Sequence, residues 1–389
     1  MSRFAAQFRV IVWEEPIYVA GDATARLTRR ICPTTQVEIV TPEIGRDSDE
    51  DEITSLRNLL NDLLEGHHGP LVRWYYTPMM LPFSQHVTAA CTVYDCMDEL
   101  ANFKNAPPEL VRLEAALLEE ADLVFTGGYS LYEAKRDRHP SVHAFPSGVE
   151  IDHFAKARLP GSTPDDQSGL PTPRLGFYGV IDERLDLALL GQIATARPDW
   201  SFVIVGPVVK ISETDLPRRP NLHYLGAKSY AELPDYLRGW DVALMPFAIN
   251  EATRFISPTK TPEYLAAGCP VVSTPIKDVV RHYKTLEAVK IADSPETFVA
   301  ACDEALDLAG RSGWLAPVDE ALAQSSWDQT YGRMADLIAS TITRADNVQP
   351  IVSPTIWPAE RRKPYDVMVV GAGFAGAVMA ERLANDAGK

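Results

Sequence analysis

SPTKTPEYLAAGCPVVSTP, residues 257–275, joins a short helical pattern to an apolar strand through a Gly-Cys-Pro break. Lys260 and Glu263 stand at positions i and i+3 of the helical part and so share one face of it. Ser257 and Thr259 come just before and predict a helix start capped by a hydroxyl side chain. A cation and a carboxylate beside the positive end of a helix suit a ligand with an anionic end and hydroxyls, such as a nucleotide sugar. The alternative is an ordinary solvated ion pair.

Apolar strand-like runs alternate with helix-length segments on both sides of this stretch. The pattern runs from residue 9 to about 150 and restarts at residue 174. It predicts an α/β chain with two doubly wound, Rossmann-like domains built on mostly parallel sheets. We interpret the Pro/Gly/Asp-rich segment 159–174 as the linker and expect domains at 1–160 and 170–340. Ligands of such sheets bind beyond the carboxyl ends of the strands, so we expect a site in a cleft between the two domains.

Two more turns of the second domain carry a glycine followed by a cation. Gly179 and Arg184 follow one strand, and Gly206 and Lys210 follow the next. Glycine allows a ligand to approach the backbone closely, and the carboxyl ends of parallel strands share one edge. Arg184 and Lys210 are therefore expected to join Lys260 around a diphosphate. The alternatives are pairing of Arg184 with a neighbouring aspartate and plain solvation of Lys210.

In the first domain, Asp95 and Asp98 follow the strand-like run CTVYD at its carboxyl end. They are candidates for acceptor binding or catalysis, and the alternative is that they cap a helix. The D-x-D sequence Asp47-Ser48-Asp49 lies inside the acidic run DSDEDE and is interpreted as a solvated loop, so no metal site is predicted.

The composition narrows the class of protein. A formal net charge of −16 disfavours binding to nucleic acid or to an anionic lipid surface. The apolar content is 46%, and no run approaches the roughly 18 apolar residues of a membrane span, so we expect a cytoplasmic protein. Five scattered cysteines indicate reduced thiols rather than disulfides.

The pattern P-x-K-x-x-E-Y-L-A-A-G-x-P-V-V around Lys260 and Glu263 resembles the donor-binding half of GT-B fold glycosyltransferases of the retaining family 4 type. The resemblance covers residues 9–340, more loosely in the first half. It implies a nucleotide-diphosphate sugar donor, UDP-linked for preference, a glycan or lipid-linked acceptor, and no obligatory metal or other cofactor. The family's second glutamate is replaced here by Phe255, and Asn250 and Arg254 are nearby substitutes. Lipid-linked acceptors would place the protein peripherally at the inner face of the membrane.

The end of the chain carries a different fingerprint. After a proline-rich tether at 345–364, the run YDVMVV leads into Gly371, Gly373 and Gly376, a G-x-G-x-x-G between strand and helix. The segment 365–389 resembles the opening of UDP-galactopyranose mutase, a flavoenzyme, and is expected to be an incomplete βα unit of a third Rossmann module. FAD would bind only a complete module, so we expect none to bind this chain.

Three functions follow from these patterns. The leading hypothesis is a metal-independent hexosyltransferase of polysaccharide biosynthesis, with UDP-galactose or UDP-galactofuranose as the boldest choice of donor. The second is a UDP-galactopyranose mutase in which the first 345 residues are accessory. The third is a sugar-nucleotide binding protein without catalysis, and the replacement of the family's second glutamate by Phe255 supports it.

Overall fold

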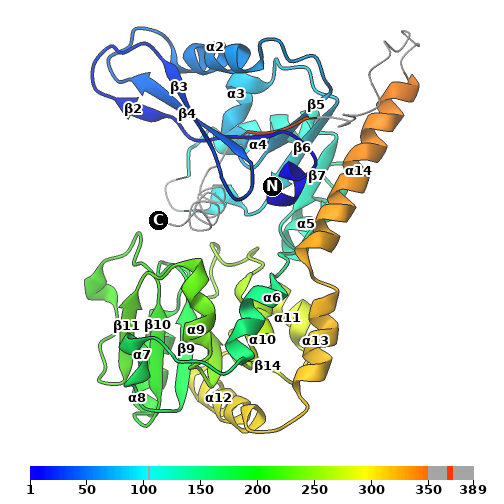
Figure 1. Cartoon of the computed structure of the whole chain (residues 1–389). Coiled ribbons are helices and arrows are strands. Elements are labelled where there is room, and N and C mark those ends of the chain that lie inside the picture. Colours follow the sequence, from blue (N-terminus) through cyan, green and yellow to red (C-terminus); the bar gives the residue numbers. More distant parts are fainter. Residues whose placement is uncertain (104–105, 349–365, 371–389) are drawn as a thin grey trace. The chain divides into compact units, whose positions relative to one another are not determined.

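The computed structural model describes residues 1–103, 106–348 and 366–370. They form two compact units. The first unit comprises Met1–Gly127, Leu131–Phe145 and the described residues from Tyr331 on, and the second comprises Gly128–Ser130 and Pro146–Thr330. Each unit holds a largely parallel sheet with helices on its faces, so the α/β prediction is confirmed (Figure 1).

The second unit is built on a six-stranded sheet in the order β11-β10-β9-β12-β13-β14, with every pair parallel. Its strands are β9 (Arg174–Tyr178), β10 (Ser201–Val205), β11 (Leu222–Gly226), β12 (Val242–Met245), β13 (Val271–Ser273) and β14 (Val289–Ile291). Its main helices are α8 (Leu187–Ala196), α9 (Leu233–Leu237), α10 (Lys260–Ala267), α11 (Lys277–Tyr283), α12 (Pro295–Ala309) and α13 (Leu315–Ala323). The strand order reverses between β9 and β12, which is where doubly wound sheets bind ligands.

Local sequence explains these elements. The runs SFVIV and VALM of β10 and β12 are buried throughout, as expected for interior strands covered on both faces. Helix α12 starts where Ser294 accepts a hydrogen bond from the backbone N–H of Thr297, with Pro295 in the first turn. It packs on β12, β13 and β14, while α9 and α13 contact α10. The core thus encloses the strands that lead to the switch point.

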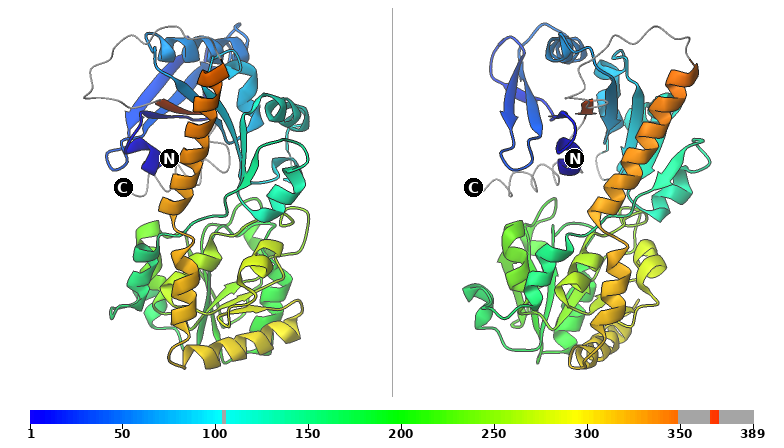
Figure 2. Two further views of the ribbon diagram at one scale, coloured as in Figure 1. Left: turned by 90° about the vertical axis from the view of Figure 1, so that its right-hand side faces the viewer. Right: turned by 45° about the vertical axis from the view of Figure 1, so that its right-hand side comes forward.

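The first unit has a nine-stranded sheet in the order β2-β4-β1-β15-β5-β6-β7-β8, with β3 paired antiparallel to β4. The strands are β1 (Val10–Trp13), β2 (Ile17–Val19), β3 (Arg26–Ile31), β4 (Glu38–Gly45), β5 (Leu71–Tyr75), β6 (Cys91–Cys96), β7 (Leu123–Thr126), β8 (Val142–Ala144) and β15 (Asp366–Val370). The helices are α1 (Ser2–Ala5), α2 (Glu52–Leu64), α3 (Leu81–Ser84), α4 (Leu110–Glu120), α5 (Tyr129–Lys135) and α14 (Trp327–Val348). Helix α14 lies across one face of the sheet, and its Ile338 is fully buried in a core with Trp74 and Phe125 (Figure 2).

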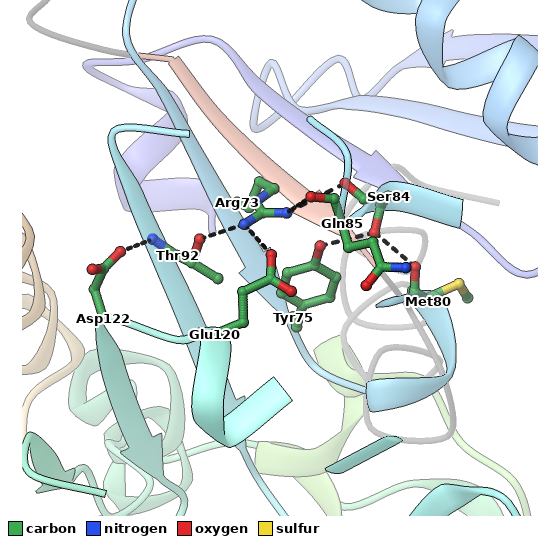
Figure 3. A network of polar contacts seen from close by, with 8 residues as sticks. All are labelled: Arg73, Tyr75, Met80, Ser84, Gln85, Thr92, Glu120 and Asp122. Carbon is green, nitrogen blue, oxygen red and sulfur yellow. Dashed lines mark hydrogen bonds and ion pairs between the residues drawn. The ribbon is translucent and has the colours of Figure 1, made fainter. Parts of the chain in front are cut away.

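A buried arginine fixes the chain around β5 and β6. Arg73, on β5, is 5% exposed and donates hydrogen bonds to the carbonyl oxygen of Gln85 at 2.9 Å, to Thr92 Oγ1 at 2.9 Å and to Glu120 at 2.5 Å (Figure 3). Tyr75 adds a hydroxyl contact of 2.8 Å to Ser84 in the same network. Both terminal nitrogens of the buried guanidinium are paired, which offsets much of the cost of burying the charge, so this cluster has a structural explanation.

The domain boundaries differ from those expected at 1–160 and 170–340. The chain enters the second unit at Pro146, and the supposed linker 159–174 packs on that unit. Gln167 is fully buried there: its side chain donates to the carbonyl oxygen of Tyr236 at 2.9 Å and accepts from the Trp240 indole at 2.8 Å. The predicted helical tail forms two helices, α13 and α14, and from Tyr331 on it belongs to the first unit.

The strand predicted to open a third module is present at Asp366–Val370, but it is not separate. As β15 it pairs in parallel with β1 on one side and β5 on the other, inside the sheet of the first unit. The backbone groups of an interior strand need hydrogen-bond partners on both edges, and these two neighbours supply them. The glycines Gly371, Gly373 and Gly376 and the rest of the fingerprint lie outside the described residues. No helix within the described ranges is both long and apolar enough to cross a membrane.

Candidate functional site

Two glycine turns meet at the carboxyl ends of β9 and β10. Gly179 and Gly206 have φ values of +144° and +146°, a region that favours glycine. A methyl group on Gly206 would overlap the carbonyl oxygen of Gly179. The two turns also pair with each other, because Ile181 donates its N–H to Pro207 at 2.9 Å. The two backbones therefore approach each other as closely as they do only because Gly206 carries no side chain.

Lys260 reaches this crossing from the first residue of α10. A methyl group on Gly179 would overlap Lys260 Cε and come within 3.0 Å of Nζ. The ammonium therefore lies over the turn that follows β9, beside the position where the strand order reverses. A cation at this place, above a glycine backbone, suits the phosphates of a nucleotide.

Glu263 lies one turn further along α10 and is 2% exposed. Tyr178, the last residue of β9, donates its hydroxyl to Glu263 Oε2. Its backbone N–H is held in turn by the hydroxyl of Tyr264, at 3.0 Å. Glu263 is therefore a held carboxylate in the protein interior and not the solvated partner of an exposed ion pair.

The start of α10 differs from the prediction. We expected a hydroxyl cap, but Thr259 has helical backbone angles, φ −64° and ψ −24°, and its side chain makes no capping hydrogen bond. A capping residue needs extended angles to turn its oxygen onto the first amides. The first turn is therefore without a side-chain cap, which leaves its amides able to bind an anion.

Arg184 and Lys210 lie in the two neighbouring turns but carry partners of their own. Arg184 forms a two-pronged ion pair with Asp182, with 2.7 Å between Arg184 Nη2 and Asp182 Oδ2, and Asp182 is 2% exposed. Lys210 Nζ lies 4.0 Å from Glu183 Oε1. The structure thus shows the alternative interpretation of Arg184, pairing with a nearby aspartate. Lys260 is the main candidate because its position, over the Gly179 turn, is the one nearest the crossing of the two glycine turns.

The loop after β12 contacts the turn after β9 through a side chain. Asn250 donates its side-chain amide to the carbonyl oxygen of Glu183 at 3.3 Å. Arg254 is 62% exposed, pairs with Glu251 at 3.3 Å and lies 5.1 Å from the Phe255 ring centroid. Asn250 is therefore attached to the site, whereas Arg254 faces solvent and is not among the contacts that join Gly179, Lys260 and Glu263.

The acidic candidates of the first unit, Asp95 and Asp98, lie at the end of β6 and just beyond it. Asp95 lies within β6, is 3% exposed and accepts a hydrogen bond from the Trp74 indole at 3.1 Å. It caps no helix, so that alternative is wrong for Asp95. Burial raises the pKa of Asp95 to about 7, although the indole bond counteracts the shift. Asp98, two residues beyond the strand, accepts the Cys96 thiol on its backbone carbonyl at 3.4 Å.

The described part of the chain contains no group of three or more histidine, cysteine or acidic side chains placed to hold a metal ion. Asp47 and Asp49 of the D-x-D sequence are exposed at the turn after β4. All five cysteines are buried and unlinked.

Sequence reasoning missed two features of the second unit. Tyr178 gave one usable signal, a phenol at the end of an otherwise apolar strand, directly before a glycine. Asp278 gave none. It lies on α11, is 1% exposed, and accepts hydrogen bonds from both the backbone N–H and the hydroxyl of Ser130. A methyl group on Gly128 would come within 3.0 Å of Ser257 Oγ and would overlap Asp278. Ser257 therefore packs beside the contact between Asp278 and Ser130 and does not cap a helix.

Known proteins resemble this chain in sequence and fold. Residues 172–307 match the family described as "Glycosyl transferases group 1". TuaH of Bacillus subtilis (strain 168), named as a teichuronic acid biosynthesis glycosyltransferase, is 28% identical over 288 residues, which cover 69% of this chain and 67% of TuaH.

Solved structures agree with this match at the level of the fold. Sucrose-phosphate synthase from Thermosynechococcus elongatus aligns with a TM-score of 0.66 over 88% of this chain and 91% of its own, at 15% identity. HepE of Anabaena, in complex with UDP and glucose, aligns with a TM-score of 0.58 over 77% and 86%, at 14% identity. These likenesses show that the fold is GT-B.

Proposed function

We propose that this chain, which has the GT-B fold, is a glycosyltransferase that moves a hexose from a UDP-sugar to a glycan or lipid-linked acceptor in the synthesis of a cell-surface polysaccharide. The carrying observation is the position of Lys260 over the Gly179 turn with the buried Glu263 one helical turn away. Two relatives support the substrates: HepE has been solved with UDP and with UDP-glucose, and TuaH is named for teichuronic acid synthesis.

In this proposal the donor diphosphate lies against the Gly179 and Gly206 turns. Lys260 and the uncapped amides at the start of α10 balance its charge. Glu263 accepts hydrogen bonds from the ribose hydroxyls, with its carboxylate held by Tyr178. A carboxylate suits this task because it accepts two hydrogen bonds from neighbouring hydroxyls without a proton of its own.

Transfer breaks the bond between the anomeric carbon and the β-phosphate oxygen and forms a bond to an acceptor oxygen, whose proton is released to water. UDP leaves with the bonding electrons, so negative charge grows on the phosphate as the bond breaks. Lys260 and the α10 amides are already in place for that charge, and preorganised groups of this kind lower the barrier most. We propose retention at the anomeric carbon and no need for a metal, since fixed cations and amides do the work of a divalent ion.

A panel of donors tests the proposal. Thermal stability is measured with UDP-, GDP- and ADP-sugars, since a ligand that binds only the folded chain raises its apparent stability by mass action. UDP release is then measured with glycan acceptors, with and without a chelator. We expect a UDP-sugar to stabilise and turn over, with UDP-galactose or UDP-galactofuranose the boldest choice. Exclusive use of a GDP- or ADP-sugar would refute the UDP assignment, and binding without UDP release would favour a binding protein.

The mutase hypothesis rests on residues 365–389 alone. We propose that they are the start of a flavin module and that FAD does not bind this chain without the rest of such a module. The pairing of β15 with β1 and β5 gives this segment a second role, in the first sheet. Flavin absorbance in the purified protein would contradict the proposal.

A further inference from the structure

A cavity of the second unit lies at the carboxyl-terminal end of helix α10. It has a volume of about 360 Å³ and is lined by Arg158, Arg238, Arg311 and Trp314, among others. Gly268 and Cys269, just after α10, also line it, as does Trp240 before β12. These residues precede strands, so the cavity is at the amino ends of β12 and β13, whereas Lys260 starts α10 at the opposite edge.

The three arginines of this cavity, here called the arginine pocket, have different duties. Arg238 has a structural role, because its guanidinium donates to the carbonyl oxygens of residues 156, 159 and 162 and pairs with Asp235. Arg158 and Arg311 are less committed. Arg311 is 56% exposed and pairs with Glu287 at 2.6 Å, where both groups are open to water. Such exposed pairs are worth little and are readily exchanged.

Arg158 gives stronger evidence for a ligand than Arg311 does. Its guanidinium pairs with Asp319 at 2.8 Å and donates to the carbonyl oxygen of Leu265 at 3.1 Å. Its Nε is buried and, among the described residues, has no hydrogen-bond partner. A buried donor without an acceptor costs about 1–3 kcal/mol, so a small shift of the side chain that brings Nε to an oxygen atom in the cavity would be favourable.

A third group points the same way. Helix α13 has nine residues and begins at this cavity, because Trp314 and Leu315 both line it. Trp314, at its N-cap position, provides no capping hydrogen bond from its side chain. The first amides of a helix attract anions, and the effect is greatest where no side chain occupies them.

We propose that the arginine pocket binds the phosphate group of a small phosphorylated metabolite. The phosphate lies between Arg158 and Arg311 at the start of α13, and its oxygens accept from these guanidinium groups and from backbone amides. Arginine favours phosphate because its planar fork donates two parallel hydrogen bonds. The volume suits a sugar phosphate or a nucleoside monophosphate, at the lower end of the range for small-molecule sites. This site is independent of the proposed donor site.

Calorimetric titration of the whole chain with inorganic phosphate, glucose 6-phosphate and UMP tests the proposal. We expect saturable binding of at least one of them, weakened about tenfold or more in both Arg158→Gln and Arg311→Gln, since each loses charge-assisted hydrogen bonds. Arg29→Gln is the matched control, because Arg29 is 49% exposed with one carboxylate 4.0 Å away in the first unit, close to the 56% of Arg311. It should bind as the parent does.

Lys260→Ala separates this site from the donor site. Binding that survives in Lys260→Ala and is lost in Arg311→Gln places the ligand in the arginine pocket. Binding that is lost in Lys260→Ala and kept in both arginine variants would overturn the proposal, as would the absence of any saturable binding by the parent. Should Arg158→Gln fold poorly, the half-exposed Arg311 decides alone.

Discussion

Two buried carboxylates at the carboxyl edges of the two sheets have opposite surroundings. Glu263 of the second unit and Asp95 of the first are 2% and 3% exposed. Glu263 receives the Tyr178 hydroxyl and shares a helix face with Lys260. Asp95 receives one indole N–H, and its other oxygen, Oδ1, has no hydrogen-bond partner among the described residues. Equal burial therefore has different consequences: the Glu263 carboxylate is held by a phenol, whereas burial raises the pKa of Asp95 and favours its neutral form.

The largest effect is expected from removing the cation that lies over the Gly179 turn. Lys260→Ala should lower kcat/KM for the donor by about 10²–10³, the usual cost of losing one preorganised group that stabilises the leaving charge. Stability should change little, since Lys260 is partly exposed. Steady-state UDP release measures the first and urea unfolding the second.

Lys290→Ala is the matched control for this loss. Lys290 is on β14 of the same unit and pairs with Glu304 at 2.9 Å, away from the glycine turns. It should keep parental turnover. Equal activity of Lys260→Ala and Lys290→Ala would remove the distinction between the two carboxylates, because Glu263 would then stand beside no functional cation.

The second prediction concerns Asp95. Its pKa rises from an ordinary 3.8 to about 7 on folding, because burial disfavours the charged form. The folded chain therefore holds a proton that the unfolded chain has lost between about pH 4 and pH 7, so this group makes stability fall as pH rises through that window. Asp95→Asn, which cannot ionise, should be more stable than the parent by on the order of 2–4 kcal/mol at pH 8, with the gain shrinking towards pH 5.

Urea unfolding of both proteins at pH 5, 6.5 and 8 measures this gain, and turnover at pH 8 shows whether Asp95 also acts in catalysis. A structural Asp95 predicts retained turnover. If turnover collapses while stability rises, Asp95 is a catalytic group after all, and the contrast with Glu263 is one of role within a single reaction.

Much of the candidate site could be predicted because it depends on the order of elements. Strand, glycine turn and helix, repeated, place Gly179, Gly206 and Lys260 at one edge of a parallel sheet whatever the side chains between them. The partners of those residues could not be predicted. The bond from Tyr178 to Glu263 and the pair of Arg184 with Asp182 depend on rotamers and on which groups a folded loop brings together. No local pattern encodes these.

The first unit was predicted less well for a related reason. The antiparallel strand β3 and the place of β15 between β1 and β5 come from pairing across long stretches of sequence. A short apolar run has the same appearance whether it opens a new module or completes an existing sheet. Asp95 was expected near a ligand because it ends a strand, but its side chain faces the Trp74 indole.

The smallest expected effect tests how Glu263 is held. Tyr178→Phe removes one donor from a buried carboxylate, which should cost about 1–2 kcal/mol of stability and raise the donor KM about tenfold with kcat nearly unchanged. A purely structural tyrosine would lower stability without changing KM. Tyr264→Phe is the matched control: its hydroxyl accepts the Tyr178 backbone N–H at 3.0 Å, so its loss should destabilise the chain yet leave Glu263 its phenol.

A double-mutant cycle with Glu263→Gln isolates the pair. If the phenol acts through the carboxylate, adding Tyr178→Phe to Glu263→Gln should raise KM far less than it does in the parent. Independent, additive effects would mean that Tyr178 supports the fold of β9 alone. Glu263 would then owe its place to helix α10 and not to a contact between neighbouring elements of the switch point.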